Sequence, residues 1–180
     1  MKKLVLDLDE TLLFSKNEAY SPACVELSAS GLTFFTSFRP GTKQFLEFVS
    51  KRFECWIWST GHQAYIESVW DYLGVSGFTL WGRDYCVKTD RADVDEPYEK
   101  PLRNITGDLT QIVIVDNTPS VFAKTPQNGI LTKTWHGDPA DNELEHLSHY
   151  LDWLSRQKSV QRDHANWRFE TLCLRTLNGL

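Results

Sequence analysis

Three short, mostly apolar runs constrain the fold of this chain more than any other feature. They lie at residues 4–8, 55–58 and 112–115, and each meets polar residues at its end. Strands with one face in water alternate apolar and polar side chains, whereas these runs are too continuous for that pattern. The pattern therefore predicts central parallel strands that are buried on both faces.

Helical patterns lie between and after these runs. One helix is expected to begin with Thr42 as its cap, a second to span about residues 62–73 and stop at Gly74, and a third to follow the turn-rich segment 137–142. The expected apolar faces are Phe45, Leu46, Val49 and Phe53; Ile66, Val69, Trp70 and Leu73; and Leu144, Leu147, Leu151 and Leu154. Alternating strands and helices predict an α/β fold, a Rossmann-like doubly wound parallel sheet whose ligands bind beyond the carboxyl ends of the strands.

Two segments depart from this alternation. Residues 15–39 alternate apolar and polar side chains about a Ser-Gly turn, which predicts a small β-hairpin inserted after the first strand, over the sheet edge. Residues 81–97 are charged and irregular, which is typical of a surface loop. We expect one domain at residues 1–157, and we treat residues 158–180 as a tail of the same domain that could form a strand, a helix or a partner-dependent segment.

The overall composition narrows the choice of partners. A formal net charge of −5 argues against a general polyanion binder, so a nucleic-acid partner is disfavoured but stays open. No apolar run reaches the length of a membrane span, and the first residues lead directly into a strand. The four cysteines lack a C-x-x-C spacing, which predicts free thiols. We expect a cytoplasmic protein, or a nuclear one in a eukaryote, with no membrane partner.

Asp7 and Asp9 stand where the first strand ends, and buried carboxylates need a partner. If the strand breaks into a loop there, both side chains line one cavity. Asp7 is then placed to attack phosphorus and form an aspartyl phosphate, and Asp9 to protonate the leaving oxygen and later activate water. Thr11 would fix the loop that turns both carboxylates toward the site.

A cation is needed between Asp7 and a phosphate group, and Mg²⁺ with oxygen ligands suits that position. Its candidate ligands are Asp7, the main-chain carbonyl of Asp9, and a third oxygen from Asp116 or Asn117 at the end of the third run.

Donors to the phosphoryl oxygens are also present. Ser59 follows the second run and offers a hydroxyl, and the Lys100 ammonium could reach the same edge and neutralise charge, with Lys88 as its alternative. Phe34, on the expected hairpin, is either a core residue or part of a pocket for an apolar residue beside a phosphorylated one, as are Phe35 and Phe38.

These motifs together resemble a known family. DLDET fits the D-x-D-x-T signature of the haloacid dehalogenase (HAD) superfamily. With RPG, WSTG…Y, and a lysine before IVIVDNTP, the chain resembles the FCP/SCP-like RNA polymerase II C-terminal-domain phosphatases over residues 4–154. The resemblance implies a Mg²⁺-dependent phosphatase. It assigns Asp7 as nucleophile, Asp9 as general acid and base, Ser59 as hydroxyl donor, Lys100 as phosphate-binding lysine, Asn117 with Asp7 as metal ligands, Asp116 at or behind the metal, and Arg83 near the substrate.

Two departures from the family pattern bear on substrate and site. The family usually has threonine where this chain has Ser59, so Thr60 could share the role of hydroxyl donor. The charged loop after Cys86 is unlike the family's, which leaves the polymerase tail open as a substrate.

Three hypotheses follow. The first is a Mg²⁺-dependent phosphatase that acts on phosphoserine or phosphothreonine in a protein or peptide. The second is the same chemistry on a small metabolite or a nucleic-acid terminal phosphate. The third is a receiver-like module that holds an aspartyl phosphate without rapid turnover.

Overall fold

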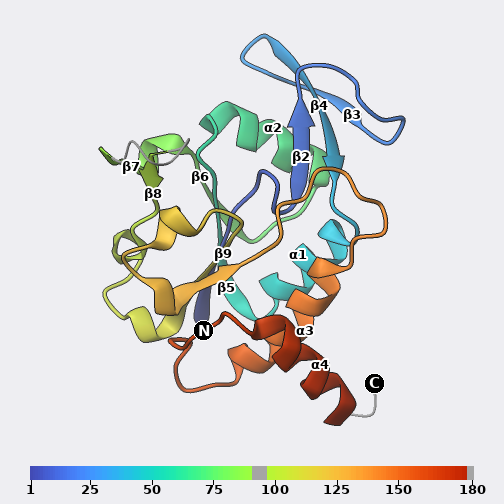
Figure 1. The fold of residues 1–180 in the computed structure, drawn as a ribbon. Coiled ribbons are helices and arrows are strands. Elements are labelled where there is room, and N and C mark those ends of the chain that lie inside the picture. The colour runs from blue at the N-terminus through green and yellow to red at the C-terminus, as the bar shows by residue number, and fades with distance from the viewer. Residues whose placement is uncertain (91–96, 178–180) are drawn as a thin grey trace.

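A five-stranded parallel sheet forms the centre of the computed structural model, which describes residues 1–90 and 97–177 (Figure 1). In spatial order its strands are β10 (Gly129–Leu131), β9 (Ile112–Asp116), β1 (Lys2–Leu6), β5 (Phe53–Trp58) and β6 (Phe78–Trp81). All neighbouring strands pair in parallel. The predicted parallel α/β sheet is confirmed, and the three apolar runs form its three central strands.

The two edge strands, β6 and β10, were not predicted. They have four and three residues, and their sequences FTLW and GIL are too short to show a period. Only their pairing with β5 and β9 identifies them as strands.

Three helices pack on one face of the sheet: α1 (Thr42–Ser50), α2 (Gln63–Leu73) and α3 (Glu143–Ser155). Their buried side chains form one cluster with Leu4, Leu6, Ile57, Val113 and Val115 of the central strands. The predicted apolar faces of α2 and α3 are all buried, so both helices are confirmed. In Figure 1, α1 and α3 lie together along one side of the sheet.

The opposite face of the sheet has a different cover. Val5, Trp56 and Ile114 pack there with residues of two short 3-10 helices, η2 (Leu102–Asn104) and η4 (Pro119–Phe122). Packing against η4 is close, because a Cβ added to Gly129 would lie 2.1 Å from the Phe122 ring. In the described part of this face, 3-10 turns stand where a doubly wound sheet usually carries α-helices.

The start of α1 differs from the prediction. Thr42 is its first residue rather than its cap, and the N-cap is Gly41, whose φ of 79° lies in the left-handed region that favours glycine. Thr42 Oγ1 instead lies 2.9 and 2.7 Å from the carbonyl oxygens of Leu12 and Arg39, which share its single hydrogen. Phe53 does not extend the helix face, because it begins β5.

The insertion after the first strand is larger than the expected hairpin. It is an antiparallel sheet of three strands in the order β2 (Leu13–Lys16), β4 (Leu32–Phe38) and β3 (Val25–Ala29). β3 and β4 form the predicted hairpin around Ser30 and Gly31, which both have positive φ, as a two-residue hairpin turn requires. β2 extends the insertion back to the DLDET segment.

The remaining segments contain short regular elements. η1 (Arg83–Tyr85) lies in the expected loop at 81–97, and β7 (Val87–Lys88) pairs with β8 (Tyr98–Glu99). Residues 91–96 of that predicted loop lie outside the described residues.

The C-terminal tail forms α4 (Trp167–Leu177), and Val160 and Trp167 join the main core. Residues 178–180 are not described. Assignment of the whole chain to one domain stays a prediction. No helix in the described ranges is long and apolar enough to cross a membrane.

Candidate active site

Strand β1 ends at Leu6, and the DLDET residues that follow it form a tight loop. The backbone N–H of Leu12 donates to the carbonyl of Leu8 at 2.9 Å, and Glu10 has a left-handed φ of 61°. Asp7 is still tied to the sheet, because its N–H donates to the Val115 carbonyl at 2.9 Å. The chain therefore breaks into a loop directly after β1, as expected for two carboxylates that serve one site.

Asp7, Lys100 and Asp116 form a buried charged group. The Lys100 ammonium donates to Asp7 Oδ1 and to Asp116 Oδ2, both at 2.7 Å. All three residues are less than one-tenth exposed. The Lys100 backbone N–H donates to the carbonyl of Val121 at 2.9 Å, which fixes this lysine beside η4. Lys100 therefore lies at this edge of the sheet beside Asp7, whereas Lys88 is exposed on β7.

Burial and neighbouring charges shift the pKa of two members of this group, Asp116 and Lys100. Burial, with the charge of Asp7 as the second cause, raises the pKa of Asp116 to about 7. Burial alone would lower the pKa of Lys100, but Asp116 and Asp7 outweigh it, so the pKa of Lys100 lies above its usual range. When all three groups are ionised, one ammonium faces two carboxylates, and one negative charge remains uncompensated.

Asp9 has a different environment, because its partners are neutral hydroxyls. Ser59 Oγ donates to Asp9 Oδ2 at 2.9 Å, and Tyr65 Oη donates to Asp9 Oδ1 at 2.5 Å. Burial raises the pKa of Asp9 to about 6, with the charge of Asp7 adding to it and both hydroxyl bonds opposing it. The two carboxylates of DLDET therefore differ in electrostatic environment.

Ser59 is held at the end of β5 by its own backbone and by Gly61. The Ser59 N–H donates to the Trp81 carbonyl at 3.0 Å, and the Gly61 N–H donates to Ser59 Oγ at 2.9 Å. A Cβ on Gly61 would lie 3.1 Å from both Ser59 Oγ and the Tyr65 ring. This position therefore favours glycine, which lets the loop approach both side chains.

Asn117 and Thr11 meet beside the same loop. Thr11 Oγ1 donates to Asn117 Oδ1 at 3.4 Å, and Asn117 Nδ2 donates to Glu10 Oε2 at 3.2 Å. Thr11 is fully buried, and its carbonyl accepts from the buried guanidinium of Arg39 at 3.0 Å, consistent with a role in fixing the loop. Arg39 in turn pairs with Asp141 at 2.7 Å.

The Arg83 side chain contacts the backbone of Thr60. Arg83 Nε donates to the Thr60 carbonyl at 2.5 Å, and its guanidinium lies 5.6 Å from the centre of the Tyr98 ring. The Ser59 hydroxyl donates to Asp9. Roles for Thr60 and Arg83 in substrate binding stay predictions.

Oxygen donors dominate this edge of the sheet, and they fit a hard cation. The expected ligand set has two carboxylates (Asp7 and Asp116), the Asn117 amide and a main-chain carbonyl. Only two of these ligands are His, Cys, Asp or Glu side chains, and among the described residues no group of three such side chains could hold a metal. Asp116 already accepts from Thr118 N at 2.8 Å through Oδ1 and from Lys100 through Oδ2. Its geometry therefore suits support of Lys100 better than direct binding of a metal.

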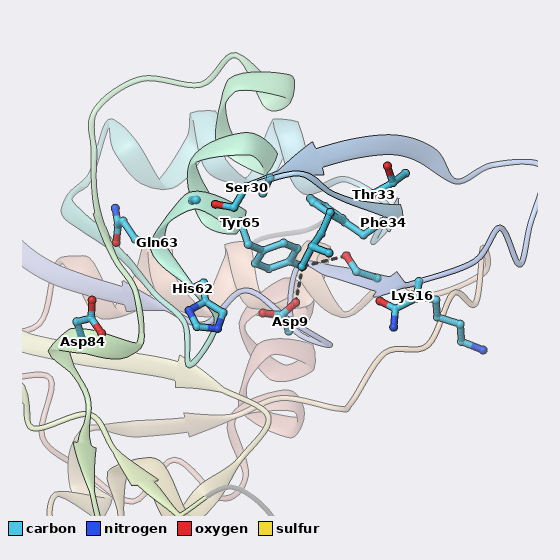
Figure 2. Close-up of a pocket in the computed structure, with 14 residues that line it drawn as sticks. Asp9, Lys16, Ser30, Thr33, Phe34, His62, Gln63, Tyr65 and Asp84 are labelled. Atoms are coloured by element: carbon cyan, nitrogen blue, oxygen red, sulfur yellow. Dashed lines mark hydrogen bonds between the residues drawn. The ribbon is translucent and has the colours of Figure 1, made fainter.

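A pocket of about 620 Å³ lies beside Asp9, between the inserted sheet and α2. Figure 2 shows Asp9 and Tyr65 pointing toward each other, with Phe34 above and Lys16 and Asp84 on opposite sides. Of the three hairpin phenylalanines, Phe34 lines this pocket, while Phe38 stacks on Tyr72 with ring centres 5.5 Å apart.

Sequence reasoning did not assign a role to Tyr65 or to Ser15. Tyr65 is the tyrosine of the WSTG…Y motif, but it also lies four residues before the buried Val69 on α2, so a helical pattern alone classes it with the apolar side chains. Ser15 contacts Tyr65 across 50 positions of sequence, and such a contact has no local signal.

Known proteins match most of this chain in sequence. The sequence model for the NLI interacting factor-like phosphatases matches residues 2–161. The CTD nuclear envelope phosphatase 1 homolog of Drosophila melanogaster is 32% identical over 172 residues, which cover 89% of this chain and 70% of the relative. The human CTD small phosphatase-like protein is 31% identical over 166 residues, which cover 88% of this chain and 58% of the relative.

The fold also resembles a solved structure, that of Fcp1, an essential RNA polymerase II CTD phosphatase. The TM-score is 0.66 at 19% identity, and the match covers 99% of this chain and 66% of Fcp1. This similarity supports the fold alone. The chain spans less than two thirds of the human relative and of the solved Fcp1 chain.

Proposed function

The chain belongs to the NLI interacting factor-like phosphatase family and is a phosphatase, and from this premise we propose that it hydrolyses phosphoserine or phosphothreonine in proteins through a covalent bond from Asp7 to phosphorus. The observation that carries the proposal is the contrast between the two DLDET carboxylates. Asp7 faces the Lys100 ammonium, whereas Asp9 is buried against the neutral hydroxyls of Ser59 and Tyr65. A nucleophile and a proton donor need these opposite surroundings.

The reaction would take two steps. An Asp7 carboxylate oxygen attacks phosphorus, the bond from phosphorus to the seryl or threonyl oxygen breaks, and Asp9 gives that oxygen a proton. In the second step Asp9 takes a proton from a water molecule, the water oxygen bonds to phosphorus, and the bond to Asp7 breaks. Inorganic phosphate leaves, and both carboxylates return to their first state.

The remaining site residues would bind and orient the phosphoryl group. Lys100 lies beside Asp7 and would offset the charge of the transferring group, and the Ser59 hydroxyl, with Thr60 beside it, would donate to a phosphoryl oxygen. Thr11 would hold the loop, and Arg83 would contact the substrate at the same edge.

Asp7, the Asp9 carbonyl and Asn117 would hold Mg²⁺, with Asp116 supporting the site through Lys100. The ion, when bound, would neutralise phosphate charge beside Asp7 and orient the phosphoryl group. Two carboxylates, Asp7 and Asp116, share the single Lys100 ammonium, which supports a cation at this place.

A protein segment is the substrate that the surroundings favour. The pocket beside Asp9 is lined by Phe34, Leu32 and the Tyr65 ring as well as by polar groups, which suits a side chain next to the phosphorylated residue. The relatives are named as CTD phosphatases, and the net charge of −5 disfavours a nucleic-acid substrate. A cytoplasmic or nuclear location stays a prediction.

The test is phosphate release from a substrate panel, with Mg²⁺ and with a chelator. The panel holds phosphoserine and phosphothreonine peptides, sugar phosphates, nucleotides and 3′-phosphorylated oligonucleotides. We expect preference for the peptides, dependence on Mg²⁺, and loss of release in Asp7→Asn with an unchanged circular dichroism spectrum. Turnover by Asp7→Asn would refute the covalent mechanism. Preference for another class of phosphate would refute the substrate, and a stable phosphoprotein without release would favour a receiver-like module.

A further inference from the structure

A chain of hydroxyl groups connects the inserted sheet to Asp9. Thr36 Oγ1 and Ser15 Oγ lie 2.7 Å apart, Ser15 Oγ and Tyr65 Oη 2.9 Å apart, and Tyr65 Oη and Asp9 Oδ1 2.5 Å apart. Ser15 on β2 and Thr36 on β4 are direct cross-strand partners, and Tyr65 comes from α2. The chain thus runs from β4 and β2 through Tyr65 of α2 to one oxygen of Asp9, and the dashed lines in Figure 2 mark its bonds beside Asp9.

The number of hydroxyl hydrogens sets the direction of this chain. Each hydroxyl has one hydrogen to donate. An Asp9 oxygen that carries no proton can only accept, so the Tyr65 hydrogen is used on Oδ1 and Ser15 must donate to Tyr65. The Ser15 hydrogen is then used as well, so Thr36 must donate to Ser15. Every bond in the chain therefore points toward Asp9 Oδ1.

This direction distinguishes the two oxygens of Asp9. Oδ1 accepts from Tyr65 at 2.5 Å, and Oδ2 accepts from Ser59 at 2.9 Å, at the end of β5 where the phosphoryl group would bind. In the proposed function Ser59 donates its single hydrogen to a phosphoryl oxygen instead, so only Oδ1 keeps its hydrogen bond once the substrate is bound. A carboxyl oxygen that already accepts from a directed chain is the poorer place for the transferable proton. Oδ2 is left as the oxygen that gives a proton to the leaving group and takes one from water.

We propose that Ser15 and Tyr65 are positioning residues for Asp9, which hold its carboxyl group through Oδ1 and direct proton transfer to Oδ2. The inference rests on the proposed function, because it assumes that Asp9 acts as general acid. Part of the geometry is set by packing: the Tyr65 ring meets the Phe34 ring edge-on with centres 4.8 Å apart, and Thr36 is fully buried. A hydroxyl can therefore be removed from this chain without removing the surrounding contacts.

The experiment compares substrates that differ in their need for a proton. A phosphoserine peptide leaves as an alkoxide and requires protonation, whereas p-nitrophenyl phosphate leaves as a stabilised phenolate and requires little. The quantity measured is kcat/KM, which reports the steps up to the first bond breakage. Loss of a positioning hydrogen bond should therefore affect the peptide much more than the aryl phosphate.

The expected losses follow from the place of each hydroxyl. Tyr65→Phe keeps the ring, and its kcat/KM for the peptide should fall by about tenfold or more. Ser15→Ala should lower the same quantity by about threefold to tenfold, since it weakens the Tyr65 bond rather than removing it. Both variants should stay within about twofold of the parent protein on p-nitrophenyl phosphate. Ser15→Thr restores the hydroxyl and should recover the peptide activity.

The matched control is Ser37→Ala. Ser37 lies next to Thr36 on β4, is buried, and its hydroxyl has no hydrogen-bond partner within the described part of the chain. Its removal should leave both activities unchanged. Equal losses on both substrates in Ser15→Ala, or no loss at all, would overturn the inference.

Asp9→Asn separates this inference from the proposed function. It should lose far more activity on the peptide than on the aryl phosphate. If it does and Ser15→Ala does not, the positioning role is wrong and the mechanism stands. If Asp9→Asn shows no such difference, the assignment of Asp9 as general acid is wrong.

Discussion

Replacing Lys100 with methionine should destabilise the fold far more than loss of an ordinary ion pair. Lys100 is 1% exposed and donates to Asp7 and Asp116, both at 2.7 Å. Methionine keeps most of the aliphatic side chain, so the main change is loss of the ammonium. Two carboxylates then share a buried site without their cation.

The magnitude follows from burial. Removing one partner of a buried ion pair typically costs about 3–5 kcal/mol, because the other charge stays uncompensated, and we expect that range here. Lys124→Met is the matched control: Lys124 also lies 2.7 Å from its partner, Glu99, but its side chain is 78% exposed. An exposed pair contributes about 0–1 kcal/mol, so the two variants separate burial from distance.

Urea unfolding with a chelator present measures both changes, and circular dichroism follows the transition. The double variant Lys100→Met/Asp116→Asn should recover part of the loss, since one of the two opposed carboxylates is removed. A cost for Lys100→Met within about 1 kcal/mol of that for Lys124→Met would refute the reasoning, as would a double variant less stable than Lys100→Met.

Two further predictions concern stability. Gly129→Ala should lower the unfolding free energy by about 1–3 kcal/mol, because the new Cβ would meet the Phe122 ring at 2.1 Å. A chemical-denaturation midpoint equal to that of the parent would contradict this prediction. Burial lowers the pKa of His164 to about 4. Its Nδ1 lies 2.8 Å from Tyr150 Oη, within hydrogen-bond distance. The unfolded state thus binds more protons between about pH 6.5 and pH 4, so this histidine contributes stability above pH 6.5 that is lost as the pH falls toward 4. From pH 7 to pH 5, the parent should lose about 1–2 kcal/mol more than His164→Asn, and equal losses would exclude the effect.

The sequence by itself determined the central sheet and most of its helical cover. The runs that became β1, β5 and β9 are apolar at nearly every position, and the faces of α2 and α3 repeat at three and four residues. Burial on both faces of a strand, or on one face of a helix, leaves such a period in the sequence. The placement of Asp7, Asp9, Ser59 and Asp116 at one edge followed from the parallel order, because parallel strands end together.

Elements whose sequence has no apolar repeat could not be predicted from hydrophobic periodicity. β6 and β10 are identified by pairing alone, and β2 is four residues that leave the DLDET loop. The 3-10 turns that cover the second face of the sheet have no repeat long enough to show which side is buried.

The tertiary structure alone decided which side chains meet. It placed Lys100 between two carboxylates rather than in solvent, directed Asn117 toward Glu10 and Thr11, and joined Ser15 to Tyr65 and Asp9. These contacts join residues separated by 16 to 107 positions. A polar side chain has the same identity in water and in a buried hydrogen bond, so its partner is known only once the chain has folded.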